Sequence, residues 1–276
     1  MGYLSSKFPR FILKIVLILI IFCLFFTFIP KFNHIANASN DSSYIVMNAK
    51  NYEVIDGDNI HLQLPMASTT KTMTALIVCE NCLPDAIISI PKEAVGIEGS
   101  SVYLKEGDVF TVKELLYGLM LRSGNDAAVA LAIFTAGSID NFASLMNYKA
   151  EELGLCNTHF VNPHGLHDKN HYTSAYDLCK LGCYAMRNPL FKEIVGTKSI
   201  SVGSDDNKRF WANKNKILNN YHGGNGIKTG FTKDAGRCLI ASATRNDVTV
   251  VSVVLNRYNM FRECELLMDK AFAKIL

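Results

Sequence analysis

Three short motifs contain the residues best suited to covalent chemistry. They are Ser-Thr-Thr-Lys at residues 68–71, Ser-Gly-Asn at residues 123–125 and Lys-Thr-Gly at residues 228–230. Together they supply a serine nucleophile, two amines and polar groups that can seat a peptide. This set suits acyl transfer through a serine ester. Each motif alone is common by chance, so the argument depends on their joint occurrence.

Ser68 and Lys71 are three residues apart, so on a helix they share one face and the amine reaches the hydroxyl. A serine hydroxyl needs a base to become nucleophilic. Lysine is a base only when burial or a second cation lowers its pKa. Pro65 precedes the motif and places Ser68 at a helix N-terminus, where the dipole favours negative charge. The alternative is an ordinary polar helix start.

The second and third motifs offer supporting groups. Ser123 can relay a proton, and Asn125 can both donate to and accept from a peptide; the alternative is a C-cap followed by an N-cap. Strand alternation puts Lys228 and Gly230 on one face, with Thr229 on the other. The positive charge of Lys228 would lower the pKa of a nearby amine. The glycine allows a ligand backbone to approach closely, and Thr229 or the nearby threonine at 232 can hold a carboxylate. The alternative for this third motif is an ordinary surface strand with a turn glycine.

The elements that must position these motifs follow from hydrophobic periodicity and capping signals. Strand patterns occupy both ends of the chain, and helical patterns fill the middle. The sequence therefore predicts an α/β fold of the α+β type, with an antiparallel sheet from both chain ends covered by helices, plus a helical block. The predicted strands are 44–47, 52–55, 238–244 and 248–255; the predicted helices are 68–82, 111–121, 126–135, 138–153, one from 174, and 258–275.

Residues 1–38 differ from the rest of the chain. Basic residues between positions 7 and 14 precede an apolar run at 15–29, and Ala36 and Ala38 form a small-residue site. This pattern predicts a secretory signal peptide cleaved after Ala38; the alternative is an N-terminal membrane anchor. Both place residues 39–276, the predicted catalytic domain, outside the cytoplasm. Without the leader the chain has 24 basic and 25 acidic residues, so we expect no nucleic-acid partner.

Seven of the eight cysteines follow the leader, an odd number, so at least one is unpaired within the chain. Cys79 with Cys82, and Cys179 with Cys183, have helical spacing that could suggest a thiolate metal site. Their apolar surroundings favour buried thiols instead. We therefore expect no metal and no cofactor.

The three motifs in this order resemble those of the low-molecular-mass penicillin-binding proteins, the serine D-alanyl-D-alanine carboxypeptidases. The resemblance covers about residues 44–272, nearly the whole exported part. It implies a β-lactamase/transpeptidase-like fold, with peptidoglycan stem peptides as substrates and β-lactams as covalent inhibitors. Beyond the motifs, the matching segments are residues 66–75, 99–101, 115–132, 158–166 and 226–232.

The resemblance also implies roles for single residues. Ser68 would attack the penultimate D-Ala carbonyl, with Lys71 as general base. Ser123 would pass the proton to the departing D-Ala, assisted by Lys228, and Asn125 would orient the acyl part.

The remaining implied contacts concern the substrate's charges. The backbone N–H groups of Ser68 and Phe231 would form the oxyanion hole. Arg262 would face the terminal carboxylate, while Thr229 and Gly230 would line the substrate strand. The loop containing His164 is expected to be structural. The two nearby histidines, His167 and His171, are expected at the surface.

Other functions use similar residues. A DD-endopeptidase would use the same site, and a non-catalytic sensor of cell-wall peptide or β-lactam would need only binding. A class A-like β-lactamase needs a Glu-x-x-Leu-Asn pattern, but the stretch from Glu152 has Cys156 where Asn is required. Many members of the family have a further β-rich domain and a C-terminal anchor helix. Here the sequence ends just after the last predicted helix. We therefore expect the protein to be secreted, or to be anchored at the outer face of the cytoplasmic membrane through the N-terminal segment.

Overall fold

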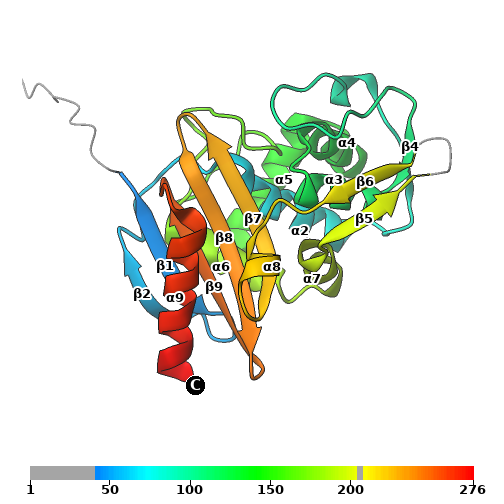
Figure 1. The fold of residues 1–276 in the computed structure, drawn as a ribbon. Coiled ribbons are helices and arrows are strands. Elements are labelled where there is room, and N and C mark those ends of the chain that lie inside the picture. Colours follow the sequence, from blue (N-terminus) through cyan, green and yellow to red (C-terminus); the bar gives the residue numbers. More distant parts are fainter. Residues whose placement is uncertain (1–40, 204–207) are drawn as a thin grey trace, which may run out of the picture. The chain divides into compact units, whose positions relative to one another are not determined.

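A five-stranded antiparallel sheet joins the two ends of the chain in a computed structural model, which describes residues 41–203 and 208–276. The predicted leader, residues 1–38, lies outside the described residues. The strand order is β2-β1-β9-β8-β7, so β1 pairs with β9 from the other end, beginning at Ser43 opposite Leu255 (Figure 1). This confirms the predicted arrangement. The strands are β1 (Ser43–Asn48), β2 (Val54–Asp58), β7 (Gly224–Thr232), β8 (Gly236–Arg245) and β9 (Val248–Leu255).

Both faces of the central strands are covered, which explains their long apolar runs. On one face, Val250 and Leu239 pack in a cluster with α9 (Met260–Ile275). On the other face, Val251 and Ile240 join the main core with α6 (Ala175–Ala185). Alternation along each strand therefore divides its side chains between two cores, one on each side of the sheet.

A helical block beside the sheet contains α2 (Lys71–Asn81), α3 (Val112–Leu121), α4 (Asn125–Ala136) and α5 (Ile139–Glu152). The capping signals predicted for α3, α5 and α6 are confirmed. Thr111 and Glu114 form a reciprocal capping box at α3, and Ser138 and Ser174 accept hydrogen bonds from the first turns of α5 and α6. Residues 125–132 of α4 are all buried, so this helix forms the centre of the block.

Some elements differ from the predictions. The helix predicted for 68–82 begins as a 3-10 turn, η1 (Ala67–Thr70), before α2 takes over. The short elements were not predicted because most have only three or four residues, and even the eight residues of α7 are too few to establish a helical periodicity. They are β3 (Ile87–Ser89), η2 (Lys92–Ala94), β4 (Val109–Thr111), α7 (Pro189–Gly196), β5 (Ser199–Val202), β6 (Arg209–Ala212) and α8 (Ile217–Asn220).

The seven cysteines of the described region are all free thiols, and four of them are buried, as the apolar surroundings predicted for most of them. The buried ones are Cys179, Cys183, Cys238 and Cys264. Within residues 41–203 and 208–276, no one helix has the length and apolarity to cross a bilayer. Helices α4 and α5 meet that criterion only when taken together, and they are bent by 83° at the break between them.

Candidate active site

The three motifs meet at one cleft of about 280 Å³, although they come from three separate elements. The first is in η1 and the start of α2, the second connects α3 to α4, and the third is in β7. The structure thus brings together residues that are 160 positions apart in sequence. The cleft is lined by Ser68, Ser100, Ser123, Lys214, Thr229, Gly230, Phe231, Met260 and Phe261.

Lys71 lies beneath the nucleophile with its amine enclosed by acceptors. The side chain is fully buried, and Nζ lies 3.0 Å from Ser68 Oγ. Nζ is also 2.7 Å from Asn125 Oδ1 and 2.5 Å from the His164 carbonyl. The serine–lysine spacing of three residues therefore produces the predicted contact.

Burial and neighbouring charge make the two motif lysines unusually acidic. Burial lowers the pKa of Lys71 well below its ordinary value, and the positive charge of Lys228 lowers it further, with Asp126 opposing. Burial, followed by the charge of Lys214, lowers the pKa of Lys228 to about 7. An amine with a lowered pKa is available as a base near neutral pH.

Left-handed backbone conformations occur at two points of the site. Ala67, directly before the nucleophile, has φ +48°, and Ser123 has φ +66°. Non-glycine residues adopt such angles only when the surrounding structure enforces them, and they concentrate at functional sites. These angles direct the chain sharply into η1 and into α4, so that Ser68 and Ser123 both line the cleft.

Asn125 and Asp126 fix the loop at residues 98–104 against the site. Asn125 Nδ2 donates to the Glu98 carbonyl at 2.6 Å, and its backbone N–H donates to the Ser100 carbonyl at 2.7 Å. The buried carboxylate of Asp126 accepts from Ser101 Oγ and from the backbone N–H groups of three residues, Val102, Leu104 and Ala127. Sequence reasoning missed Asp126 because an acidic residue in a helical first turn is ordinary.

The loop at residues 158–166 supports the nucleophile from the other side. The carbonyl of His164 contacts Lys71 Nζ, while burial lowers the pKa of the His164 imidazole to about 3. The ring is therefore neutral, and its Nδ1 accepts from the Leu166 N–H at 3.2 Å. A Cβ on Gly165 would overlap the Ala67 carbonyl. These contacts support the structural role predicted for this loop.

The position of His171 differs from the prediction. It was expected at the surface, but only 3% of it is exposed, and Nε2 lies 2.8 Å from Thr70 Oγ1. Burial lowers its pKa to about 4. The reason is that the strand-like bridge from His159 to Tyr172 folds this segment back under η1. His167, by contrast, is exposed.

Strand β7 presents the third motif along an open edge. It pairs with β8 only, so its other edge has no strand partner among the described residues. A Cβ on Gly230 would lie 3.1 Å from the Ser68 nitrogen, so the strand and η1 approach closely here. Thr229 and the backbone of Phe231 lie along the same edge, and Lys228 Nζ donates to the Thr229 carbonyl at 2.8 Å.

Arg262 lies apart from the other predicted residues. Its side chain is 68% exposed and is 3.7 Å from Glu265, and Arg262 is not part of the described cleft lining. The preceding residues Met260 and Phe261 do line the cleft, and each further helical residue turns by about 100°. Thr232 is used in the β7–β8 turn, where Oγ1 accepts from the Ala235 N–H at 3.0 Å.

Lys214 is the main residue of the cleft that sequence reasoning did not find. It lies in an irregular segment between β6 and α8, with its backbone N–H bonded to the Leu121 carbonyl at 3.2 Å. Burial lowers its pKa, followed by the charge of Arg122. No motif spacing connects residue 214 to the nucleophile, because only the folded chain brings it there.

The stretch that resembled a β-lactamase motif lies elsewhere. Glu152 forms an ion pair with Lys149 at 2.8 Å and is not part of the described cleft lining. Cys156, at the position where that motif requires asparagine, is exposed. The stretch therefore begins at the last residue of α5, close to the end predicted for the helix at 138–153.

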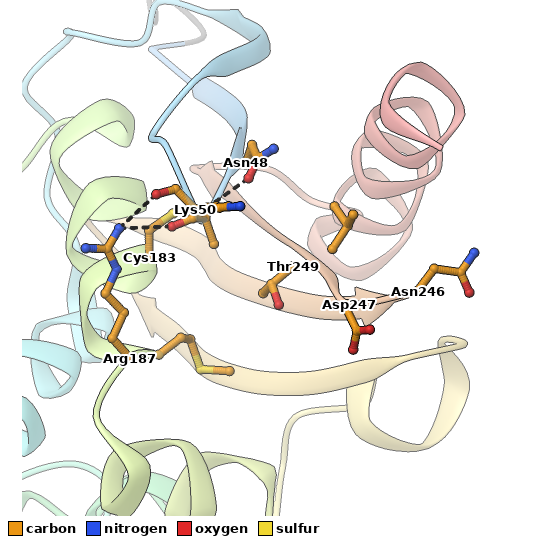
Figure 2. A pocket seen from close by; sticks show the side chains of 10 residues that line it. Asn48, Lys50, Cys183, Arg187, Asn246, Asp247 and Thr249 are labelled. Atoms are coloured by element: carbon orange, nitrogen blue, oxygen red, sulfur yellow. Dashed lines mark hydrogen bonds between the residues drawn. The ribbon is translucent and has the colours of Figure 1, made fainter.

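A larger hollow of about 530 Å³ lies at the β8–β9 turn (Figure 2). Arg187 there donates to the carbonyls of Ala49 and Lys50 at 3.3 and 3.1 Å, which ties the β1–β2 turn to the end of α6. None of the motif residues lines this hollow, and its thiol, Cys183, is buried. Its contacts are those of structural support.

Comparison with known proteins gives consistent results. A family model described as D-alanyl-D-alanine carboxypeptidase matches residues 31–259. The chain is 36% identical over 223 residues to D-alanyl-D-alanine carboxypeptidase DacF of Bacillus subtilis, covering 79% of this chain and 57% of that protein. It is 39% identical over 206 residues to the D-alanyl-D-alanine carboxypeptidase of Streptomyces sp. strain K15, covering 68% and 71%.

Solved structures agree with the fold. The Streptomyces K15 DD-transpeptidase superposes with a TM-score of 0.78 at 35% identity, covering 83% of this chain and 96% of that one. The D-alanyl-D-alanine carboxypeptidase DacD of Francisella tularensis gives 0.78 at 27% identity, covering 83% and 70%. These likenesses confirm the predicted fold class. The chain spans little more than half the length of the Bacillus relative.

Proposed function

Because the chain belongs to the D-alanyl-D-alanine carboxypeptidase family of serine peptidases, we propose that it removes the terminal D-Ala from peptidoglycan stem peptides outside the cytoplasmic membrane. Residues 39–276 are the proposed peptidase domain, and residues 1–38 the export signal or anchor. β-Lactams would acylate the same serine because they present a reactive amide in place of the peptide bond.

The proposed attack begins at the Ser68 hydroxyl. A neutral lysine amine has two N–H groups and one lone pair. The carbonyl of His164 and Oδ1 of Asn125 accept the two N–H groups, so the lone pair of Lys71 is left for the Ser68 O–H. Lys71 takes that proton as Oγ bonds to the carbonyl carbon of the penultimate D-Ala. The carbonyl oxygen becomes an oxyanion held by the N–H groups of Ser68 and Phe231.

Breakdown of this intermediate releases D-Ala. The carbon–nitrogen bond breaks, and the leaving nitrogen receives a proton from Lys71 through the Ser123 hydroxyl, with Lys228 favouring the transfer by its charge. The shortened peptide remains as an ester of Ser68. Water then attacks the ester and gives its proton to Lys71, while Ser68 Oγ regains a hydrogen. Water thus supplies the OH of the new carboxyl group and the hydrogen that returns to Ser68 Oγ.

The observation that carries the proposal is the buried Lys71 amine 3.0 Å from Ser68 Oγ in a cleft that opens along β7. A buried lysine without an acidic partner at this distance costs stability, and this cost is consistent with a catalytic base. An edge strand accepts a peptide by strand addition, which places the scissile carbonyl beside Gly230.

The test is D-Ala release from an acyl-D-Ala-D-Ala peptide by the purified full chain. We expect release by the wild type and none by Ser68→Ala, with circular dichroism showing that both are folded. Release by Ser68→Ala at the wild-type rate would overturn the assigned nucleophile. A folded wild type that releases no D-Ala would overturn the proposed reaction.

A second activity is supported by the structural neighbour described as a DD-transpeptidase, 96% of which this chain covers. The same ester can react with an amine instead of water. Adding glycine or a peptide amine to the assay should then divert part of the acyl group into a new peptide bond. The ratio of transfer product to free shortened peptide measures this division.

A further inference from the structure

A second hollow of about 420 Å³ adjoins the catalytic cleft. Its chemistry differs from that of the cleft, because its walls combine aromatic rings with positive side chains. We name it the aromatic–cationic groove, defined by Tyr103, Lys105, Arg122, Phe210 and Trp211.

The groove and the cleft share three segments of chain. In each segment one residue lines the cleft and a residue next to it or a few positions away lines the groove. Adjacent Cα atoms are 3.8 Å apart, and an extended peptide advances by about 3.5 Å per residue. The shared segments place the groove beside the part of the cleft that Ser100, Ser123 and Lys214 line. The pairs, cleft residue first, are Ser100 and Ser101, Ser123 and Arg122, and Lys214 and Trp211.

The aromatic side chains of the groove are placed for contact with a ligand. Tyr103 is 82% exposed and Phe210 is 69% exposed, which is unusual for rings of this size. Trp211 is almost fully buried and forms the wall, where it packs so closely on Gly118 of α3 that a Cβ there would lie 3.1 Å from its ring. Two exposed rings beside a buried one offer flat apolar faces to a peptide.

The positive charges of the groove have no carboxylate partner within the described part of the chain. Arg209 is bonded to Asp108 at 2.6 Å, but neither Lys105 nor Arg122 forms an ion pair there. Arg122 donates one hydrogen bond, of 3.4 Å, to the Ala212 carbonyl. Its guanidinium has five N–H donors, so most of them are available for a carboxylate.

The groove is held in shape by hydrogen bonds that are already present. Asp126 fixes Ser101 and Val102 from below, and Arg209 donates to the carbonyls of Val102 and Tyr103 at 2.8 and 3.2 Å. A surface that is ordered before the ligand arrives loses little entropy on binding.

We propose that the aromatic–cationic groove binds a free carboxylate on the acyl side of the substrate, about two residues before the penultimate D-Ala. The inference rests on the proposed function, since it assigns this part of the substrate to the same site. Arg122 and Lys105 hold the carboxylate, and Tyr103 and Phe210 contact the peptide beside it.

The test uses two peptides that differ in one group. Both are acyl-γ-D-Glu-L-Lys-D-Ala-D-Ala; one has the free α-carboxylate of the glutamyl residue and the other has it as an amide. We measure Kd for each with the full chain carrying Ser68→Ala, which binds without turnover, and D-Ala release with the wild-type serine. We expect the carboxylate peptide to bind about tenfold more tightly, as for a charge-assisted hydrogen bond.

Variants of the groove residues then test whether these residues cause the tighter binding of the carboxylate peptide. Lys105→Gln and Arg122→Gln should each reduce it, and Arg122→Lys should restore part of it by keeping the charge. Phe210→Ala should weaken both peptides alike. Two matched controls, Lys169→Gln and Tyr148→Ala, change an exposed cation and an exposed ring that do not line either hollow, and they should leave both Kd values unchanged.

The outcomes separate the two proposals. The proposed binding of the carboxylate in the groove would be overturned by equal Kd values for the two peptides. It would also be overturned if the combined Lys105→Gln and Arg122→Gln variant kept the preference for the carboxylate peptide. A preference that these variants remove supports the groove even when the wild type releases no D-Ala, a result that would overturn the proposed reaction alone.

Discussion

At the scale of single residues, the site contains two groups that resemble a catalytic base, and their surroundings separate them. His164 has a pKa lowered to about 3 and offers its backbone carbonyl, not its ring, to Lys71. Lys71 is directed at Ser68 Oγ, and burial, followed by the charge of Lys228, lowers its pKa well below the ordinary value. Geometry and the surroundings of the two groups therefore favour the lysine as the proposed base.

Lys71→Arg provides a sharp test of that assignment. A guanidinium has nearly the same charge and reach as an ammonium but stays protonated at any working pH, so the base is lost. We expect acylation of Ser68 by a penicillin, followed by intact-protein mass, to fall by about 10³-fold. His164→Gln is the comparison, and it should retain acylation within about tenfold. Rapid acylation of Lys71→Arg would contradict the role.

Gly230→Ala tests the close approach of β7 to η1. The added Cβ would lie 3.1 Å from the Ser68 nitrogen, which is one of the proposed oxyanion donors. Overpacking of this kind costs about 1–3 kcal/mol, and we expect the acylation rate to fall by about tenfold or more. Gly196→Ala is the matched control, because its Cβ would meet the nearest atom at an ordinary 3.5 Å. Equal rates for both variants would show that the approach is not needed.

At the scale of elements, the start of α4 organises the site. Asn125 reaches Lys71 and Asp126 reaches the loop at 98–104, so two consecutive residues connect the nucleophile's helix to the loop that lines both hollows. A shift of this helix start would move the base, the cleft and the aromatic–cationic groove together.

Asp126→Asn should loosen the loop at residues 98–104 from the start of α4. The amide nitrogen cannot accept hydrogen bonds from the backbone N–H groups that the carboxylate now satisfies. We expect the free energy of unfolding to fall by about 2–3 kcal/mol and proteolytic cleavage within residues 98–104 to increase. Asp140→Asn, in the first turn of α5, is the control for loss of an acidic helix start. Unchanged stability and cleavage would contradict the proposed support.

Much of this organisation follows from the sequence. Local sequence signals predicted the corresponding local structure correctly. They are the β-branched run at 248–255, the capping residues Thr111 and Ser138, and the serine–lysine spacing. Lys214 and Asp126 escaped prediction because their roles depend on contacts between distant segments. Arg262 was assigned by resemblance alone, and its place on α9 depends on a helix phase that the pattern does not fix. The short strands β3 to β6 were missed because they lack a full period.

At the scale of the whole molecule, the two buried motif lysines, Lys71 and Lys228, lower the stability of the folded state. Lys228 is 2% exposed and has one hydrogen bond among the described contacts, to the Thr229 carbonyl. Burying a charged amine disfavours the folded state, and the lowered pKa measures this. The protein therefore gives up stability to keep two amines in the site.

This cost has a pH signature. The pKa of Lys228 is about 7 in the folded chain against 10.5 ordinarily, so the unfolded chain binds more protons between those values. The free energy of unfolding should rise with pH across this window, and the penalty is largest below pH 7. We expect Lys228→Met to exceed the wild type in stability at pH 6.5, and the difference to shrink by on the order of 2–3 kcal/mol by pH 9.

Urea unfolding at the two pH values measures the effect. Lys169→Met, an exposed position, controls for loss of a surface charge and should follow the wild type at both. A difference between wild type and Lys228→Met that is the same at pH 6.5 and pH 9 would contradict the assigned pKa.

The pairing of β1 with β9 has a consequence for the order of events during folding. Ser43 lies opposite Leu255, so the central strand pair cannot form until nearly the whole chain is available. Such long loops are slow to close, and folding rates fall as contacts become more distant in sequence. Ser68 and Lys71 are synthesised early, whereas β7 pairs with β8, which pairs with β9, and both of these strands follow β7 in the chain. A chain still emerging from its point of synthesis therefore contains Ser68 and Lys71 with no completed cleft around them, and the proposed reactivity begins only when the last strands arrive.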